Sequence, residues 1–505
     1  MPELTDPTVH GDELVLVLPW QLFDPHPLVA HRSHAQVVVW EDPLHFGDDE
    51  YDPGWHAATL AYRRAAIDAW VAAHPGVQHL AWEPDRDMSN TLRAVIESAP
   101  RVHVCDPVDE WSERRLRSLM TEAAVELVVH PTPAFLLDAE TARTEFAGSP
   151  RRMRMAPFYQ RQRRRFGLLL DPDDEPVGGR WSFDEDNRKR LPKDVVGDLP
   201  AWPWPTDTPA HQAAADWART VRPEAPGSAR VAFPTTAAAA RAHLRQFAEE
   251  RFYRFGPYED AMHPGSALLF HGAISPMLNH GLLTPREVID TIVEAAAADD
   301  RIELASVEGF VRQVIGWREY MRAAYLVHAS ELRQGNHWGH WRALPDGMLT
   351  ARTGIAPVDD VLDRVLELGW CHHIERLMVI GNYLFLTETH PDEAYRCFTA
   401  LFTDATDWVM LTNSNGMSQD AASGVLTTKP YMSGSAYLKR MGWPKGPWCE
   451  IWDALYWNFV DRHAEGLRAH PRMSQVAANL ARLDPERLQH HRDVAAEHLD
   501  EIRRG

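Results

Sequence analysis

Five short runs of Val, Leu and other apolar residues divide the first 140 residues, and each has the length of a buried β-strand. The runs occupy residues 13–20, 35–41, 77–83, 101–106 and 125–130. Stretches with helical periodicity lie between them, at residues 55–74, 88–100 and 109–124. Strand and helix in alternation predict a parallel sheet with helices on both faces. Residues 1–150 are therefore expected to form one α/β domain.

A connector is predicted over residues 151–228. Its first part, residues 151–166, carries seven arginines and no acidic residue. From residue 167 onward the segment is rich in Pro, Asp and Gly, which is typical of a long surface connection. Trp181, Phe183 and the tryptophans from Trp202 on are expected to dock parts of it on the protein.

Only helices are predicted over residues 229–505. Residues 235–252, 284–298, 306–326 and 356–370 all place apolar residues at i, i+3, i+4 and i+7. Pro357 stands where the first turn of a helix tolerates proline. A small α/β domain, a long connector and a large all-helical domain make a two-domain architecture.

The composition argues against several classes of protein. A formal charge of −20 argues against non-specific coating of nucleic acid, so any DNA contact must be local, as residues 151–166 would allow. No apolar run reaches the roughly 18 residues that cross a bilayer. The acidic N-terminus lacks the basic start of a signal peptide, and there are only four cysteines, so we expect a cytoplasmic protein without disulfides.

Common catalytic and metal-binding motifs are missing. The cysteines at 105, 371, 397 and 449 show no CxxC spacing, and the histidines at 337–341 and 372–373 have no third ligand at a suitable spacing. The sequence contains no HExxH, GxSxG, P-loop or GxGxxG motif after a strand. Zinc proteases, α/β-hydrolases and Walker-type ATPases lose their main support, and no metal site is predicted.

Two predicted helices carry an unusual set of polar residues. Residues 308–319 place Glu, Arg and Gln around Trp317, and residues 371–386 embed two histidines, Arg376 and Asn382 among apolar side chains. Burying such groups is costly unless something satisfies them. Mutual salt bridges are one answer. A large polar and aromatic ligand such as a flavin is the other.

Five stretches resemble the bacterial deoxyribodipyrimidine photolyase-related proteins, also called prokaryotic (6-4) photolyases or iron–sulfur bacterial cryptochromes and photolyases. They are MAPFYQRQRRRFGLLLDPDDEPVGGRWSFDEDN, VEGFVRQVIGWREYMR, HHIERLMVIGNY, NGMSQDAASGVLTTKPYMSGSAY and DALYWNF followed by HPRM. The resemblance implies a Rossmann-like α/β antenna domain, a linker and an all-α FAD-binding domain. It also implies a monomer in which light-excited reduced FAD repairs a pyrimidine dimer, of the (6-4) type, flipped out of damaged DNA.

The resemblance also implies site residues. Those expected to hold FAD are His271, Ser275, Asn279, Arg312, Trp317, Arg318, Arg376, Asn382, Asn413, Met417 and Ser418. Those expected to face the lesion are His373, as its proton donor, with His372, Tyr431 and Gln313. Those expected to meet the DNA backbone are Arg161, Arg163, Arg164 and Arg165.

The chain departs from the family at its iron–sulfur cluster. The four ligand positions correspond to Pro357, Lys445, Trp448 and about Glu450, with Cys449 as a neighbour. One thiolate cannot hold a cluster that needs four, so no 4Fe-4S cluster is predicted. We expect the tryptophans of the stretch RMGWPKGPWCEIWDALYWNF to fill the vacated space.

Other departures concern light and the flavin. The positions of the family's electron relay carry Leu349, Cys397 and Phe398, none of which is an easily oxidised Trp or Tyr. Gly272 and Ala422 replace polar residues near the flavin. In the antenna domain, Pro19–Trp20 replaces Gly–Asp and residues 54–64 replace a lysine-rich stretch, which leaves a ribolumazine antenna uncertain.

Three functions stay open at this point: a flavin-dependent DNA photolyase, a cryptochrome-like photoreceptor without repair, and a scaffold that has lost the flavin. His373, Arg376, Tyr431 and the basic stretch favour the photolyase. The altered relay and the acidic charge favour the other two.

Overall fold

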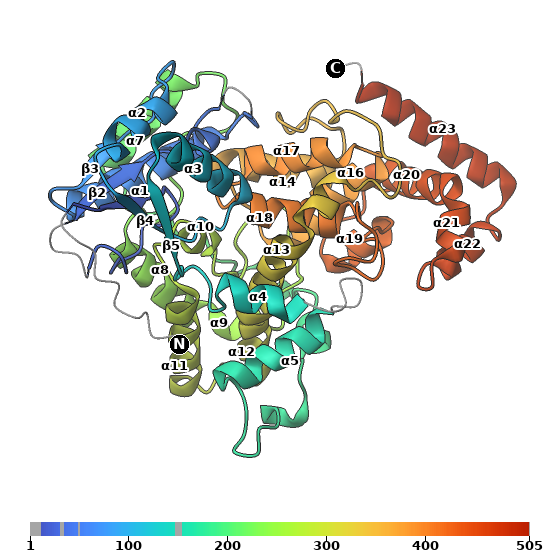
Figure 1. The fold of residues 1–505 in the computed structure, drawn as a ribbon. Helices are drawn as coiled ribbons and strands as arrows, with labels where there is room; N and C mark the ends of the chain where they lie inside the picture. The colour runs from blue at the N-terminus through green and yellow to red at the C-terminus, as the bar shows by residue number, and fades with distance from the viewer. Residues whose placement is uncertain (1–11, 31–34, 49–50, 147–153, 504–505) are drawn as a thin grey trace.

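The computed structural model describes residues 12–30, 35–48, 51–146 and 154–503 (Figure 1). Its N-terminal part holds one parallel five-stranded sheet in the order β3-β2-β1-β4-β5. The strands are β1 (Leu14–Val17), β2 (Gln36–Trp40), β3 (Gln78–Leu80), β4 (Arg101–Cys105) and β5 (Glu126–His130). All five predicted strands and their parallel pairing are confirmed.

Three helices connect the later strands, as the periodicity predicted. They are α1 (Ala57–Ala73), α2 (Met88–Ile96) and α3 (Glu110–Ala123). The chain leaves the centre of the sheet in one direction through α1 and in the other through α3. Because parallel crossovers are right-handed, α1 covers one face, and α2 and α3, which contact each other, cover the opposite face.

The two edge strands differ from the prediction that every strand would be buried. In β1 all four residues are buried, and in β2 and β4 all but the first residue are. In β5 no residue is fully buried, and in β3 only Leu80 is. A strand at the end of the order has one neighbour only, so its side chains keep contact with water.

The connector contains more regular structure than its composition suggested. The helices are α5 (Met155–Phe166), α6 (Lys193–Val196) and α7 (Pro209–Val221), with short turns η3 (Val177–Gly179) and η4 (Asp184–Asn187); α4 (Ala139–Phe146) precedes them, within the residues predicted as the α/β domain. The prediction missed α7, which packs on α1. Its signal is present in the sequence: the Thr208 side chain accepts a hydrogen bond from the backbone N–H of His211, and Pro209 opens the helix.

Helices make up the regular structure after residue 230, as predicted. They include α8 (Ala237–Glu250), α9 (Phe252–Phe255), α10 (Ser275–Asn279), α11 (Pro285–Ala298), α12 (Leu304–Val311), α13 (Glu319–Gln334), α14 (Ala356–Leu368), α15 (His373–Glu375) and α16 (Asn382–Leu386). They continue with α17 (Pro391–Leu401), α18 (Asp407–Met410), α19 (Ser435–Met441), α20 (Trp448–Arg462), α21 (Ala464–Ala469), α22 (Ser474–Leu480) and α23 (Pro485–Glu501).

Three helices of this part pass through π-helical turns. These are η5 (Arg312–Arg318) between α12 and α13, η6 (Arg376–Gly381) between α15 and α16, and η7 (Leu411–Ser418) after α18. π-Helical turns are rare in proteins, but those that occur lie frequently at functional sites. The wider turn changes the direction of the side chains. All three lie in segments that the resemblance marked as part of the flavin site.

The sheet and the helices share one continuous hydrophobic core. The same cluster of buried side chains includes Trp40 of β2 and Trp452 of α20, both without exposed surface. The residues predicted as two domains are thus packed together in one body. Within the described ranges, no helix combines the length and the apolar character that a membrane span requires.

Candidate functional site

Arg318, at the end of η5, is held by neutral groups. It donates to the Asn279 Oδ1 atom at 2.6 Å and to the Ala134 carbonyl at 3.3 Å, and its guanidinium packs against the rings of Phe135 and Trp408, 4.7 and 5.0 Å from their centres. It forms no ion pair with the described residues, its Nε has no hydrogen-bond partner there, and burial lowers its pKa to about 10. A half-buried cation in this state is a binding partner for an anionic group.

A small cavity of ≈ 20 Å³ lies beside Arg318, at the junction of the sheet and the helices. Three lining side chains have a buried polar atom without a hydrogen bond among the described residues: Arg318 Nε, His45 Nε2 and Thr406 Oγ1. The space suits one water molecule. A larger ligand at Arg318 therefore requires the lining side chains to move apart.

Arg376, the first residue of η6, makes the strongest ion pair of the site. Its guanidinium donates to both carboxylate oxygens of Asp404, at 2.8 and 2.9 Å, and its Nε donates to the Cys371 carbonyl at 2.9 Å. The Asp404 carbonyl accepts a hydrogen bond from Asn279 at 2.7 Å. Asp404 thus joins Arg376 to Asn279, and no sequence pattern had singled it out.

Asn382 directly follows η6, and η7 contacts η6. Asn382 donates to the Ser433 hydroxyl at 2.9 Å and accepts from the Ser433 backbone N–H at 3.3 Å. A Cβ on Gly381 would lie 2.1 Å from Ser418 Oγ, so only glycine allows η6 and η7 to approach this closely. Met417 is buried, and Asn413 donates to the Val409 carbonyl at 2.8 Å. The structure brings these predicted residues together.

The segment before α10 has a strained backbone. Leu269 and Ala273 have φ angles of 45° and 48°, a left-handed conformation that is uncommon outside glycine and often marks functional sites. Gly272 lies between them, and a Cβ on it would lie 3.3 Å from the Phe247 ring. The serine of relatives would be crowded here. Ser275 accepts a hydrogen bond from Trp370 Nε1 at 3.1 Å.

Three histidines meet beside Arg376. The rings of His271 and His372 are stacked, with centres 4.4 Å apart and planes 12° apart. His372 is buried and has no hydrogen bond at either ring nitrogen among the described residues. The His373 side chain is exposed, yet close-packed protein atoms and the charge of Arg376 lower its pKa to about 4. All three are therefore neutral at pH 7, since burial lowers the pKa of the other two as well.

Arg312 and Gln313, at the start of η5, face a different set of groups. Arg312 is paired with Asp184 at 2.6 Å, and Gln313 donates to Glu259 at 2.5 Å. Trp317 packs edge-on against Tyr320 at 5.8 Å. Tyr431, two residues before Ser433, is half-buried. These predicted residues lie around a polar cluster. The contacts of this cluster are separate from those of Arg318 and Arg376.

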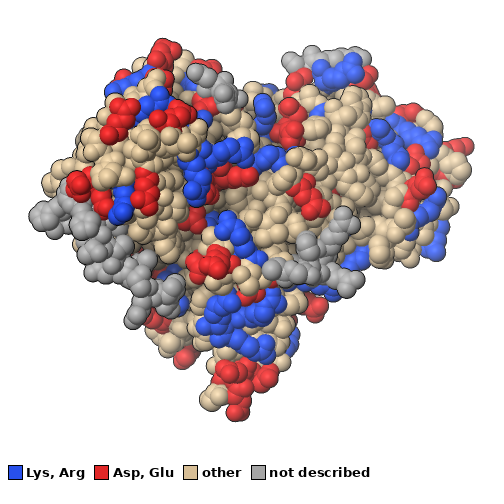
Figure 2. Space-filling model, in the orientation of Figure 1, with Lys and Arg blue, Asp and Glu red and all other residues tan. Residues whose placement is uncertain are grey.

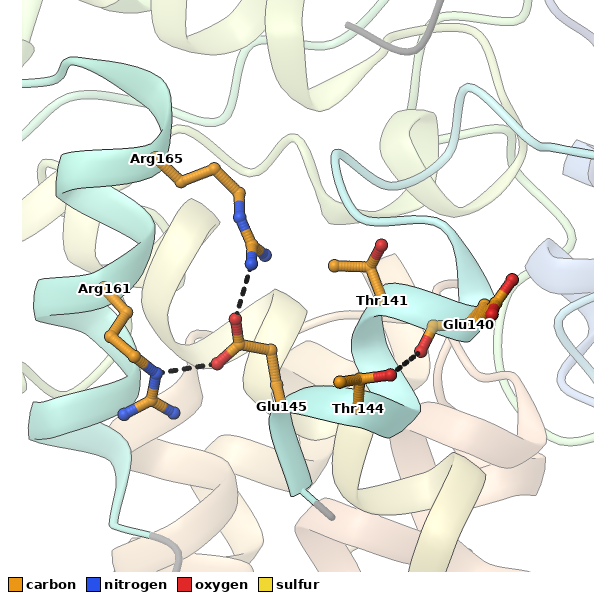
Figure 3. A pocket seen from close by; sticks show the side chains of 6 residues that line it. All are labelled: Glu140, Thr141, Thr144, Glu145, Arg161 and Arg165. Atoms are coloured by element: carbon orange, nitrogen blue, oxygen red, sulfur yellow. Dashed lines mark hydrogen bonds and ion pairs between the residues drawn. The ribbon is translucent and has the colours of Figure 1, made fainter.

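The basic stretch gives two exposed arginines that are already paired. Glu145 of α4 accepts from Arg161 and Arg165 of α5, at 2.7 Å each (Figure 3). The open pocket between these helices, ≈ 520 Å³, is lined by Glu140, Thr141, Thr144, Glu145, Arg161 and Arg165. Arg164 is exposed, forms no ion pair with the described residues, and lies 4.4 Å from the Trp181 ring.

Arg163 does not contact solvent, contrary to its predicted role in DNA binding. It is 1% exposed, and its guanidinium donates to the backbone carbonyls of Leu168, Leu169 and Trp181. It therefore holds the turn after α5 and is unavailable to phosphate. Residues 151–153 of the predicted basic helix lie outside the described residues.

The crevice between β1 and β4, where strand order reverses, is the usual ligand site of such a sheet. Here Trp20 donates to the Pro107 carbonyl at 2.8 Å, and Gln21 donates to the Cys105 carbonyl at 2.9 Å. The ring of His45 packs 4.2 Å from that of Trp20. The protein's own side chains therefore line the crevice and pack against one another.

The positions of the relatives' cluster carry groups that do not fit one. Pro357 and Trp448 offer no ligand for iron, and Glu450 is paired with His490 at 2.9 Å. Among the described residues, no group of three His, Cys, Asp or Glu is arranged to hold a metal. Cys449 is buried against the core.

Three tryptophans of residues 440–459 are buried, while their replacement of a cluster stays a prediction. Trp443 and Trp448 are 4% exposed and Trp452 is fully buried. Trp452 donates to the Ser433 carbonyl at 2.8 Å and packs edge-on against Trp448 at 6.1 Å. Since Ser433 holds Asn382, this aromatic packing supports the site residues from behind.

The three positions of the family's electron relay differ in their exposure to solvent. Leu349 is exposed, whereas Cys397 and Phe398 are buried. The Phe398 ring stacks on Phe402 at 5.7 Å, and Phe402 lies under the Arg376 guanidinium at 4.1 Å. An aromatic path thus leads from the site to α17, but it consists of phenylalanines, which are difficult to oxidise.

Asp109 makes stability depend on pH. It caps α3 through the backbone N–H groups of Trp111 and Ser112, and burial together with the charge of Asp407 raises its pKa to about 7. The folded protein therefore binds a proton that the unfolded chain releases near pH 4, so this group's contribution to stability falls as pH rises from 4 to 7. We expect Asp109→Asn, which keeps the cap, to stabilise the protein by roughly 2 kcal/mol at pH 8 and by much less at pH 5. Urea unfolding at both pH values checks this, and an equal effect at both would contradict it.

The fold is that of photolyases and cryptochromes. A bacterial class III photolyase from Agrobacterium tumefaciens superposes with a TM-score of 0.56 over all of both chains at 16% identity, and a Synechocystis cryptochrome gives 0.56 over 82% of this chain and 83% of its own at 13% identity. The family model described as deoxyribodipyrimidine photo-lyase-related protein matches residues 15–233. A (6-4) photolyase of Agrobacterium fabrum is 32% identical over 415 residues, 78% of this chain and 79% of its own. The chain belongs to the deoxyribodipyrimidine photolyase-related family.

Proposed function

We propose that this protein binds FAD and uses light to repair pyrimidine dimers in DNA, with (6-4) photoproducts as its substrate. The observation that carries the proposal is that three π-helical turns, η5, η6 and η7, include most of the residues expected to hold the flavin, while Asn279 and Asp404 link Arg318 of η5 to Arg376 of η6. The sequence likeness to a (6-4) photolyase supports the choice of lesion.

The chemistry of the site fits a flavin nucleotide. Among the described residues, Arg318 has no ion pair and can meet a phosphate or the flavin ring, and His271 and His372 have ring nitrogens without hydrogen bonds. Asn279, Asn382 and Asn413 add amides that can donate and accept. When bound, reduced and photoexcited FAD supplies an electron to the lesion and recovers it after the lesion splits.

The protein's own residues would position the lesion and manage its proton. His373 is exposed beside the buried pair His271–His372, so it is accessible to a base flipped out of the duplex. Its neutral ring carries one N–H, which can donate a hydrogen bond to the lesion. The negative field of bound DNA favours the imidazolium form, from which a proton can be transferred.

Light-dependent lesion loss tests the function. Purified protein, loaded with FAD and chemically reduced without oxygen, is illuminated with a (6-4) lesion oligonucleotide, and the products are separated by chromatography. Repair under light and none in the dark supports a photolyase. Bound flavin without lesion loss favours a photoreceptor, and absence of bound flavin favours a scaffold; either result contradicts the proposal.

Arg164 is expected to contribute to DNA binding through a phosphate. Figure 2 shows basic side chains gathered over the region of α5, and Arg164 is the exposed arginine of its last turn that has no acidic partner among the described residues. We expect Arg164→Ala to weaken DNA binding several-fold, equally for damaged and undamaged DNA, and to reduce the slope of log K against log salt by about 1. Fluorescence anisotropy across a salt series measures this.

Arg86 provides the matched control. It is an exposed arginine just before α2, and α2 and α5 lie far apart in Figure 1. Arg86→Ala should leave both the affinity and the salt slope unchanged. An Arg164→Ala protein with an unchanged slope would remove α5 from the DNA interface.

A further inference from the structure

Glu259 makes a short hydrogen bond with a residue expected to face the lesion. It lies in the loop between α9 and α10, and its Oε1 accepts from Gln313 Nε2 at 2.5 Å. Gln313 is half-buried, whereas Arg312 and Val314 on either side of it are buried. The contact therefore fixes a side chain that remains partly accessible between two buried neighbours.

The carboxyl group of Glu259 is itself held in place. Its Oε2 accepts a hydrogen bond from Asn187 Nδ2 at 3.3 Å and lies 3.9 Å from the guanidinium nitrogen Nη2 of Arg312. Asn187 is 1% exposed and also donates to the Ala305 carbonyl at 3.2 Å. Glu259 thus has both oxygens engaged and cannot turn away from Gln313 without losing these contacts.

Tyr431 belongs to the same cluster. Burial raises its pKa, and the nearby charge of Asp184 adds to the effect. Asp184 also pairs with Arg312, next to Gln313. Tyr431 and Arg312, the neighbour of Gln313, thus interact with the same carboxylate from segments more than 100 residues apart.

The cluster is less negative than its acidic residues suggest. Burial raises the pKa of Glu259 to about 8, although the charge of Arg312 opposes this. Burial likewise raises the pKa of Asp260 to about 6. A protonated Glu259 can still accept from Gln313 through its carbonyl oxygen, and it adds no charge that would repel the phosphates of DNA.

We propose that Glu259 is a positioning residue that, with Asn187, fixes the Gln313 amide for recognition of a damaged pyrimidine. One N–H of the amide is committed to Glu259. The other N–H and the carbonyl oxygen remain, and they match the imide edge of a thymine, which presents a carbonyl acceptor and an N–H donor. If the amide were flipped, its N–H would face the N–H of the thymine and its carbonyl oxygen would face the carbonyl oxygen of the thymine. This inference rests on the proposed function.

The test compares binding of a (6-4) lesion duplex and its undamaged counterpart in the dark, by anisotropy at fixed salt. Glu259→Leu and Gln313→Leu should each lower the preference for the lesion by about 10-fold, the effect of one or two lost hydrogen bonds. The double variant should fall no further, because Glu259 acts through Gln313. Glu259→Gln keeps an acceptor and should stay within about threefold of the wild type.

Thermal unfolding checks that each variant folds. If Glu259→Leu does not fold, Asn187→Ala is the second variant, and it should lose part of the preference for the lesion duplex. If Glu259→Leu retains the preference for the lesion duplex, or if the losses add in the double variant, this inference is overturned and the proposed function is not. A wild-type protein that binds both duplexes equally would overturn the proposed function together with it.

Discussion

Replacement of His373 by alanine is expected to slow repair of a (6-4) lesion by ~100-fold or more, the usual contribution of a general acid. The flavin content should not change, because the His373 side chain is exposed and supports no buried contact of the cradle. Single-turnover repair under light, with flavin absorbance as the second readout, measures both.

The pH profile distinguishes proton donation from packing. Since the pKa of His373 is lowered to about 4 by its close-packed surroundings and by Arg376, the imidazolium form becomes more populated as pH falls. Repair by the wild type should accelerate from pH 8 to pH 5, and the His373→Ala variant should lose that dependence. His490→Ala, which replaces an exposed histidine of α23, is the control and should behave as the wild type. Equal pH profiles in all three proteins would contradict the role of His373.

Replacement of Trp452 by alanine is expected to destabilise the protein by about 3–5 kcal/mol, the cost of removing a fully buried tryptophan. The side chain is buried in the stretch to which the resemblance assigns an iron–sulfur cluster, and its Nε1 donates a hydrogen bond to the Ser433 carbonyl. Loss of this hydrogen bond should also loosen Asn382, so flavin affinity should fall with stability. Urea unfolding and flavin titration measure the two effects.

Trp457 on the same helix provides the comparison. It is half-buried and packs against Tyr456 at 5.2 Å. Trp457→Ala should cost much less and leave flavin affinity unchanged. If both variants lose the same stability, aromatic packing has not replaced the cluster as the structural centre of this region.

The periodicity of the sequence was sufficient for most of the fold. Alternation of apolar runs and helical stretches predicted all five strands and α1 to α3, because one face of each element must be buried. It could not separate edge strands from central ones, since β4 and β5 each have three apolar residues of five. The helix α7 was missed because its alanine-rich sequence follows a segment full of prolines.

The candidate site was less predictable because its partners lie far apart in the sequence. Arg376 was recognised from its motif, but its carboxylate partner Asp404 lies in a loop without periodicity. Glu259 was missed for the same reason. Arg163 looked like a DNA contact among other arginines, and only the fold shows that three backbone carbonyls take up its charge.

The absorption spectrum of the purified protein tests most directly whether η5, η6 and η7 form a flavin cradle. We predict the spectrum of a bound flavin with about one FAD per chain after reconstitution, and its loss on Arg318→Leu, which removes the unpaired cation. A protein that stays folded but retains no flavin when FAD is supplied would contradict the account.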